Sequence, residues 1–232
     1  VSCRLMSDPS SPTVAMRLDD VILRIAGAAR AAGRDPASVT LTAVSKVQPP
    51  EAIDAALAAG LRVFGENRVQ EAQGRWLERR TKSADLELRL IGPLQTNKAL
   101  DAVALFDVIE TLDREKLARA LADAIQKTGC HPSILIQVNT GAEPQKAGVL
   151  NSDVDTLIET TRQTYGLRIE GLMAIPPADE DPAVHFERLA ALSRRHGLGT
   201  LSMGMSGDFE VAIRHGATHV RVGSALFGER EP

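Results

Sequence analysis

The feature that most limits the fold of this chain is a regular alternation of short β-branched segments with longer segments rich in alanine and leucine. Short β-branched runs are typical of buried strands, and apolar residues spaced three or four apart are typical of helices. The pattern predicts eight strands, at residues 39–44, 61–64, 86–91, 106–110, 134–139, 167–173, 200–203 and 218–222. Helices are predicted at residues 14–32, 51–59, 68–80, 114–128, 152–164 and 182–196.

This alternation indicates parallel βαβ units that close into a single (β/α)8 TIM barrel with an extra N-terminal helix. The competing fold is a doubly wound open sheet, which a glycine-rich nucleotide loop after the first strand would favour. The turn there reads SKVQPP, residues 45–50, and neither G-x-G-x-x-G nor a P-loop motif occurs in the chain. A barrel domain is therefore predicted over residues 14–232. Residues 1–13 are expected to form a disordered leader, since they lack the apolar core of a signal peptide.

Composition argues against several classes of partner. The net charge is −3, aromatic residues make up 3% of the chain, and no long basic block is present, so neither nucleic acid nor an anionic membrane is favoured. No apolar stretch reaches the roughly 18 residues of a membrane-spanning helix. Two cysteines and five histidines without metal-ligand spacing indicate neither a disulfide framework nor a metal site. The cytoplasm is the expected location.

Lys46 lies at the carboxyl end of the first predicted strand, which is apolar, with Ser45 between them. A lysine at the carboxyl end of a buried strand is partly desolvated. Desolvation disfavours the ammonium form, and the neutral amine is a nucleophile that condenses with aldehydes. The alternative is that Lys46 only marks the place where a strand reaches solvent.

Polar residues and glycines follow most of the other predicted strands. In (β/α)8 barrels the chemistry lies on the loops after the carboxyl ends of the strands. The residues at these positions are Lys46, 65–67, 92–98, Asn139, Met173, 204–208 and 223–224. The alternative for each is an ordinary helix cap or tight turn, which uses the same residue types.

The turns after the last two strands resemble a phosphate site. Residues 206–208, Ser-Gly-Asp, open one helix, and Gly223 and Ser224 open a short helix near the end of the chain. Backbone N–H groups and hydroxyls at helix amino ends bind phosphate, and barrels commonly place such a site after strands seven and eight.

Arg221 lies on the last predicted strand between Val220 and Val222. Alternation places the valines on one face of the strand and Arg221 on the other. If the valines pack under the helices, Arg221 points into the barrel mouth. An interior arginine needs an acceptor, such as a heterocyclic nitrogen or a carboxylate. The alternative is a buried salt bridge, for which Glu66 is the candidate.

Several other side chains have alternative roles. Glu66 is either a general base or, as we expect, the partner of Arg68 or a neighbouring cation. Lys98 and Lys146 follow polar loops and are expected to be solvated. Met203 and Met205 are candidates for packing on a cofactor ring, although filling gaps in a core is the commoner role of methionine.

Pyridoxal 5′-phosphate (PLP) combines a lysine-reactive aldehyde, a phosphate and a ring nitrogen. Phosphorylated sugar aldehydes match the lysine and the phosphate site but offer nothing to Arg221. A Schiff-base aldolase of such sugars therefore remains an alternative that leaves this arginine unexplained.

Six sequence motifs, in order, resemble those of the pyridoxal phosphate homeostasis protein family. They are AVSK (43–46), FGENRVQE (64–71), IGPLQTNK (91–98), GLM (171–173), SMGMSGD (202–208) and VRVGSALFG (220–228). The resemblance covers about residues 14–230 and implies a barrel like the N-terminal domain of alanine racemase.

The resemblance also implies roles for individual residues. Lys46 would hold the cofactor as an internal aldimine, and Asn67 would flank it. The phosphate would be bound by Ser206, Gly207, Gly223 and Ser224, and Arg221 would meet the pyridine nitrogen.

A carrier is predicted in preference to a racemase. Racemisation needs a proton donor on each face of the substrate carbanion, and alanine racemases supply the second with a tyrosine and add a carboxyl-terminal β domain. Here the only tyrosine, Tyr165, precedes the sixth predicted strand and is expected at the opposite rim, and the chain ends at Pro232. An arginine at the ring nitrogen also weakens the ring as an electron sink.

We therefore hypothesise a protein that buffers or delivers PLP and so affects the balance of amino and keto acids. Its partners would be PLP and, transiently, apo forms of PLP enzymes, and a monomer is expected. The alternative is a PLP-dependent amino-acid racemase or a related PLP enzyme.

Overall fold

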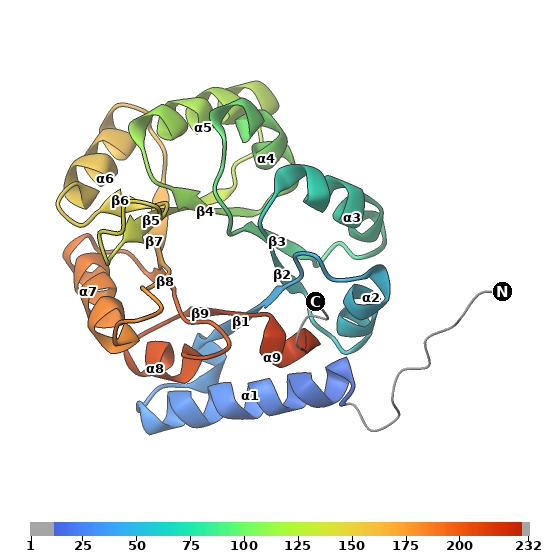
Figure 1. The fold of residues 1–232 in the computed structure, drawn as a ribbon. Coiled ribbons are helices and arrows are strands. Elements are labelled where there is room, and N and C mark those ends of the chain that lie inside the picture. The colour runs from blue at the N-terminus through green and yellow to red at the C-terminus, as the bar shows by residue number, and fades with distance from the viewer. Residues whose placement is uncertain (1–11, 229–232) are drawn as a thin grey trace.

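Eight parallel strands form a closed barrel in the computed structural model, which describes residues 12–228 (Figure 1). The strands are β1 Thr40–Val44, β2 Val63–Glu66, β3 Glu87–Leu90, β4 Val108–Leu112, β5 Ser133–Asn139, β7 Ile169–Ala174, β8 Thr200–Ser202 and β9 His219–Val222. A two-residue strand, β6 Val149–Leu150, pairs with the end of β5. The predicted (β/α)8 fold is confirmed. Residues 1–11 of the predicted leader lie outside the described residues.

Helices surround the barrel, as Figure 1 shows. They are α1 Val14–Ala31, α2 Pro50–Ala58, α3 Val69–Lys82, α4 Ala99–Leu105, α5 Glu115–Thr128, α6 Val154–Gln163, α7 Pro182–Arg195, α8 Phe209–Arg214 and α9 Ser224–Phe227. Short 3-10 helices lie at Pro36–Ser38 and Thr96–Lys98. None of the helices within residues 12–228 has the length and hydropathy needed to cross a membrane.

Two pairings close the barrel. Strand β1 pairs with β9 in the register Thr40↔His219 to Ala43↔Val222, and β4 pairs with β5. Helix α1 packs against α8 and α9 and lies across the seam between β1 and β9 (Figure 1). Because the strands are parallel, their carboxyl ends gather at one rim, where the predicted site residues follow them.

The sequence pattern did not predict α4 or β6. Helix α4 has seven residues, about two turns, and a short apolar run of this length cannot be distinguished from a buried strand by periodicity. Its presence moves the start of β4 from residue 106 to Val108, and Phe106 packs in the core between the two elements. Strand β6 contains only two residues, fewer than any strand pattern requires.

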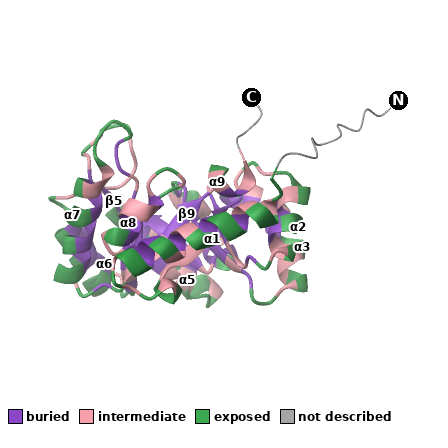
Figure 2. Cartoon of the chain, turned by 90° about the horizontal axis from the view of Figure 1, so that it is seen from below, coloured by how far each residue is buried: buried purple, intermediate pink, exposed green. Residues whose placement is uncertain are grey.

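The main apolar core lies between the strands and the surrounding helices. Alternate strand residues such as Leu88, Ile109 and Val220 belong to this cluster, together with the buried faces of the helices. Figure 2 shows the same division, with buried strands inside and exposed outer faces on the helices. The other strand face points into the barrel, where a small apolar cluster around Leu135 and Met173 lies beside buried polar side chains. The interior is therefore partly polar.

Gly171 is required where β7 passes β8. A Cβ atom added at Gly171 would lie 2.1 Å from the backbone oxygen of Thr200, its cross-strand neighbour. The pairing of β5 with β7 also shifts register at this point, between Ile134 and Leu135. Any side chain at position 171 would force the two strands apart.

We predict that Gly171→Ala lowers the free energy of unfolding by about 1–3 kcal/mol, the usual cost of overpacking. Urea denaturation measures the change. Gly27→Ala is the matched control, because Gly27 is exposed on α1 and a Cβ there meets nothing within 4 Å. The control should gain about 0.5–1 kcal/mol from the reduced flexibility of the unfolded chain. Equal stability of the two variants would contradict the close approach at Gly171.

Candidate functional site

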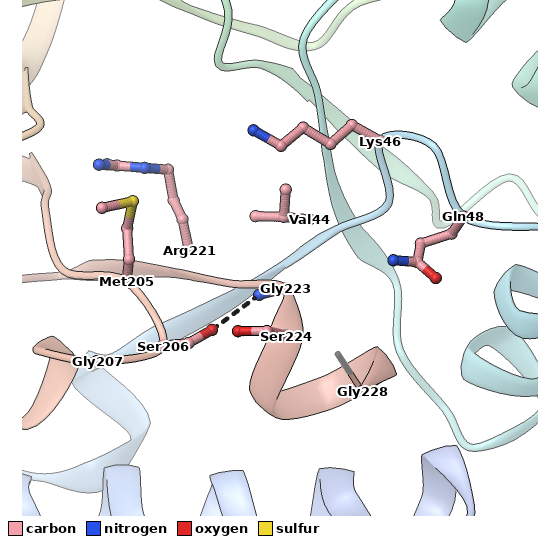
Figure 3. Close-up of a pocket in the computed structure, with 10 residues that line it drawn as sticks. All are labelled: Val44, Lys46, Gln48, Met205, Ser206, Gly207, Arg221, Gly223, Ser224 and Gly228. Carbon is pink, nitrogen blue, oxygen red and sulfur yellow. Dashed lines mark hydrogen bonds between the residues drawn. The ribbon is translucent and has the colours of Figure 1, made fainter. Parts of the chain in front are cut away.

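A pocket of about 510 Å³ opens at the rim formed by the carboxyl ends of the strands (Figure 3). This volume lies within the range of small-molecule sites. Its walls come from the end of β1, the loop after β8 and the turn from β9 into α9. The lining residues are Val44, Lys46, Gln48, Met205, Ser206, Gly207, Arg221, Gly223, Ser224 and Gly228.

Lys46 enters the pocket from the turn that follows β1. Its side chain is partly buried and extends over Val44 toward the side of the pocket where Arg221 lies (Figure 3). The next residue, Val47, has a φ of 56°, a left-handed conformation that a β-branched residue rarely adopts. The turn is anchored on its other side by Ser45, whose hydroxyl donates to Glu66 at 2.7 Å.

The turns after β8 and β9 meet through Ser206. Its hydroxyl oxygen accepts hydrogen bonds from the backbone N–H groups of Gly223 and Ala225, both at 3.3 Å (Figure 3). The turn that carries Ser206 depends on Gly204, whose φ is +94° and whose Cβ would collide with Ala212. Asp208 closes this turn by accepting from Met205 N at 2.6 Å. Hydroxyls and N–H groups of two neighbouring turns therefore face the same end of the pocket.

Arg221 is buried on β9, and its side chain borders the pocket. It donates to the hydroxyl of Ser202 at 2.7 Å and to the backbone oxygen of Ala174 at 2.8 Å. Burial lowers the pKa of Arg221, while the charge of Glu110 opposes this change. The guanidinium stays charged, because the ordinary pKa of arginine is far above neutral pH.

A second cavity of about 340 Å³ adjoins the pocket and shares four of its residues, Val44, Lys46, Met205 and Arg221. Its further lining includes Asn67, Gly92 and Gln137. Gly92 allows a close approach, since a Cβ there would lie 2.3 Å from the backbone oxygen of Asn67. The loops after β2 and β3 are therefore held together beside Lys46.

The structure brings most of the predicted site residues together. Six of them line the pocket: Lys46, Ser206, Gly207, Arg221, Gly223 and Ser224. Asn67 lines only the adjoining cavity.

Met203 requires a correction. It is fully buried in the main core and does not line either cavity, whereas Met205 lines both. The glycine turn at position 204 carries the chain from the core to the rim between these two methionines.

Gln48 and Gly228 also line the pocket, and the sequence pattern had not selected them. Both lie in turns close to predicted site residues, and this closeness in sequence could have identified them.

Glu66 pairs with a neighbouring cation, as expected, although that cation is not Arg68. Its buried carboxylate accepts from Arg75 at 2.9 Å and from the indole N–H of Trp76 at 2.9 Å, as well as from Ser45. It contacts neither Arg68, which pairs with Glu71, nor Arg221. The expectation of a neighbouring cation was correct, but the cation is on the second turn of α3. Glu66 joins the end of β1 to this helix.

Tyr165 lies away from the pocket, as predicted. It follows α6 and precedes β7, on the side of the amino ends of the strands. Its hydroxyl donates to Glu115 at 2.7 Å, and Arg119 lies over its ring. It lines neither of the two cavities around Lys46.

Lys98 and Lys146, expected to be solvated, are each about a third exposed. Lys98 lies 3.9 Å from Asp101. Lys146 lines the adjoining cavity, where it pairs with Glu143 at 2.6 Å and donates to the backbone oxygen of Pro176 at 3.2 Å.

Comparisons with known proteins give a consistent result. A family model for the N-terminal domain of alanine racemase matches residues 24–231. The pyridoxal phosphate homeostasis protein of Pseudomonas aeruginosa is 46% identical over 94% of this chain and 96% of its own length. The proteins of that name from Aquifex aeolicus and Escherichia coli K12 are 41% and 38% identical, each over 97% of its own length and over 93% and 94% of this chain.

Solved structures show the same relationship. PipY of Synechococcus elongatus is 38% identical over 93% of this chain and 100% of its own, with TM-scores of 0.81 without PLP and 0.79 with PLP bound. An alanine racemase from Corynebacterium glutamicum aligns over 90% of this chain and 60% of its own, at 19% identity and a TM-score of 0.62. The latter similarity concerns the fold alone.

We predict that His219, which begins β9 on the interior face, makes stability depend on pH. Burial and then the charge of Arg89 lower the pKa of His219 from 6.5 to about 4. The unfolded chain therefore takes up this proton first as pH falls, and stability is lost between pH 6.5 and 4. The loss is about 3 kcal/mol at 1.36 kcal/mol per pKa unit.

Urea denaturation of His219→Gln at several pH values tests this. The variant should lack this part of the pH dependence, whatever its stability at pH 7. His131→Gln, at an exposed position, is the control and should keep the full dependence. An unchanged pH slope in His219→Gln would show that other groups cause it.

Proposed function

The chain belongs to the pyridoxal phosphate homeostasis proteins, which share the alanine racemase N-terminal domain, and we propose that it binds PLP in the pocket around Lys46. The single observation that carries this assignment is the convergence of three groups on one pocket: an amine, an arginine and two turns with hydroxyl and N–H donors. Each matches a different part of PLP. The function that follows is to hold the cofactor and contribute to intracellular PLP homeostasis.

The chemistry of the donor set fits the cofactor. The amine of Lys46 is the nucleophile in the pocket, and the aldehyde is the electrophile that PLP supplies when bound. The volume of about 510 Å³ is in the range that encloses a small ligand. The side of the pocket at Gly207 is open, since a Cβ added there meets nothing within 4 Å.

The phosphate would lie at the turns joined by Ser206. The hydroxyls of Ser206 and Ser224 and the backbone N–H of Gly223 are the donors available there. The N–H of Gly223 donates to the hydroxyl oxygen of Ser206 in this structure. When phosphate binds, one of its oxygens would replace this hydroxyl as the acceptor. Hydrogen bonds to a charged acceptor are stronger than bonds to a neutral one.

Arg221 would meet the ring nitrogen, with Asn67 beside the ring. An arginine is a donor that keeps its proton, so the ring nitrogen remains unprotonated and the ring withdraws electrons weakly. This suits a protein that holds the cofactor more than one that stabilises a substrate carbanion.

The residues around the cavities support a carrier in preference to a racemase. No tyrosine, histidine, cysteine or carboxylate lines either cavity within the part of the chain that the structure describes. The second amine, that of Lys146, is engaged by Glu143 and by the backbone oxygen of Pro176.

The proposal also covers the location, oligomeric state and partners of the protein. The protein would act in the cytoplasm as a monomer and would buffer PLP or deliver it transiently to apo forms of PLP enzymes. An open pocket at the rim suits such exchange, because the cofactor can enter and leave without a change in the barrel.

We predict that Lys46→Ala abolishes covalent attachment of PLP. The PLP-loaded wild-type protein should absorb at about 420 nm and should retain cofactor on the denatured chain after borohydride reduction. The variant should lose both properties, as measured by absorbance and by intact mass. Lys98→Ala is the control, because Lys98 follows a neighbouring strand but lines neither cavity. Full trapping on Lys46→Ala would disprove the assignment of this lysine.

Delivery is tested by mixing the PLP-loaded protein with an apo aminotransferase and following the recovery of activity. A phosphatase that destroys free PLP is added to one set of samples. Recovery that resists the phosphatase indicates direct transfer, and recovery that the phosphatase removes indicates buffering through free PLP. Turnover of alanine or serine enantiomers by the loaded protein at ordinary enzymatic rates, about 10 s⁻¹, would contradict the carrier function.

A further inference from the structure

A chain of buried polar groups inside the barrel connects Arg221 to Glu110 on β4. The hydroxyl of Ser202 on β8 donates to Glu110 Oε2 at 2.6 Å and accepts from Arg221 Nη1 at 2.7 Å. The direct distance from Arg221 Nη1 to Glu110 Oε2 is 4.0 Å. Arg221 and Glu110 therefore interact mainly through one hydroxyl group.

Glu110 is held on its other side by Arg89 of β3. Arg89 Nε donates to Glu110 Oε1 at 2.6 Å, and a second nitrogen of Arg89 bonds to Glu87 at the amino end of the same strand. The side chain of Glu110 is completely buried, whereas that of Glu87 is 39% exposed. Glu110 is thus fixed between two arginines, and it is the only carboxylate within 4.0 Å of Arg221 among the described residues.

The relay through Ser202 has a consequence for the direction of the guanidinium. A direct bidentate pair with a carboxylate would engage one edge of the guanidinium and hold it against β4. Here the described guanidinium of Arg221 donates two hydrogen bonds, one to Ser202 and one to Ala174, and the side chain still borders both cavities. Because the hydroxyl has one proton, which it gives to Glu110, its lone pair faces Arg221.

We propose that Glu110 is a positioning residue for the cofactor, which acts through Ser202 to hold Arg221 toward the pocket and to balance its charge there. This inference rests on the proposed binding of PLP at Lys46. Without the carboxylate, Arg89 and Arg221 would be two buried like charges in one barrel interior, and the guanidinium would lose the acceptor chain that orients it.

Glu110→Gln tests the proposal, with Glu87→Gln as the matched control. Both substitutions remove a carboxylate that contacts Arg89, but only Glu110 is connected to Arg221. Three quantities are measured for each protein: PLP affinity by equilibrium dialysis, the absorption spectrum of bound PLP, and the urea midpoint.

Glu110→Gln should weaken PLP binding about tenfold, the effect of one charge-assisted hydrogen bond. It should also reduce the long-wavelength band of bound PLP, because uncompensated positive charge disfavours the protonated form of the nitrogen that joins Lys46 to the cofactor. Glu87→Gln should leave affinity within about twofold of wild type and the spectrum unchanged.

A purely structural role for Glu110 makes a different prediction. The urea midpoint would then fall while the folded variant kept wild-type affinity and spectrum, and this result would overturn the proposal.

If Glu110→Gln does not fold, Ser202→Ala is the deciding variant, because it removes the hydroxyl between Glu110 and Arg221 without removing a charge. It should weaken PLP binding by about three- to tenfold, and a wild-type affinity and spectrum would overturn the proposal. Failure of the wild-type protein to bind PLP would instead reject the proposed function.

Discussion

The pairing of β1 with β9 is the contact on which the site depends. It joins the first and last strands of the barrel in the register Thr42↔Arg221 and so places the turn that bears Lys46 beside the turn that bears Gly223. The two turns are separated by more than 170 residues of sequence, and only closure of the sheet brings them together. Helix α1 covers this seam from outside, where it packs on α8 and α9. The extra helix therefore stabilises the strands that carry most of the pocket.

The two faces of the barrel strands have different roles: one face packs against the helices, and the other carries polar groups into the interior. Residues that point outward form the main apolar core with the helices, so they supply most of the hydrophobic stabilisation. Residues that point inward include Arg89, Glu110, Ser202 and Arg221, which are buried and bonded to one another. Buried charges are costly unless they are paired. The interior network reduces that cost and leaves one arginine bordering the pocket.

The relation to alanine racemases is one of shared fold, with 19% identity to the Corynebacterium glutamicum enzyme. What separates this chain from a racemase is the chemistry at the pocket. Tyr165 lies at the other end of the barrel, and Lys146, which lines the adjoining cavity, is paired with Glu143. The relatives from Pseudomonas aeruginosa, Aquifex aeolicus and Escherichia coli, at 46%, 41% and 38% identity, are named pyridoxal phosphate homeostasis proteins, which agrees with this interpretation of the site.

The sequence by itself determined the fold class and most of the residues at the pocket. The strand–helix rhythm predicts parallel strands, and parallel strands bring their carboxyl ends to one rim, so Lys46, Ser206 and Gly223 could be selected from their positions after strands. The tertiary structure alone decided which methionine faces the pocket and which carboxylate serves Arg221. Strand alternation would place Met203 and Met205 on the same face, but β8 ends at Ser202 and the turn at Gly204 leaves Met203 in the core and Met205 at the pocket. The sequence suggested Glu66 as the carboxylate for Arg221, and only the closed barrel shows that β4, which carries Glu110, lies across the interior from β9.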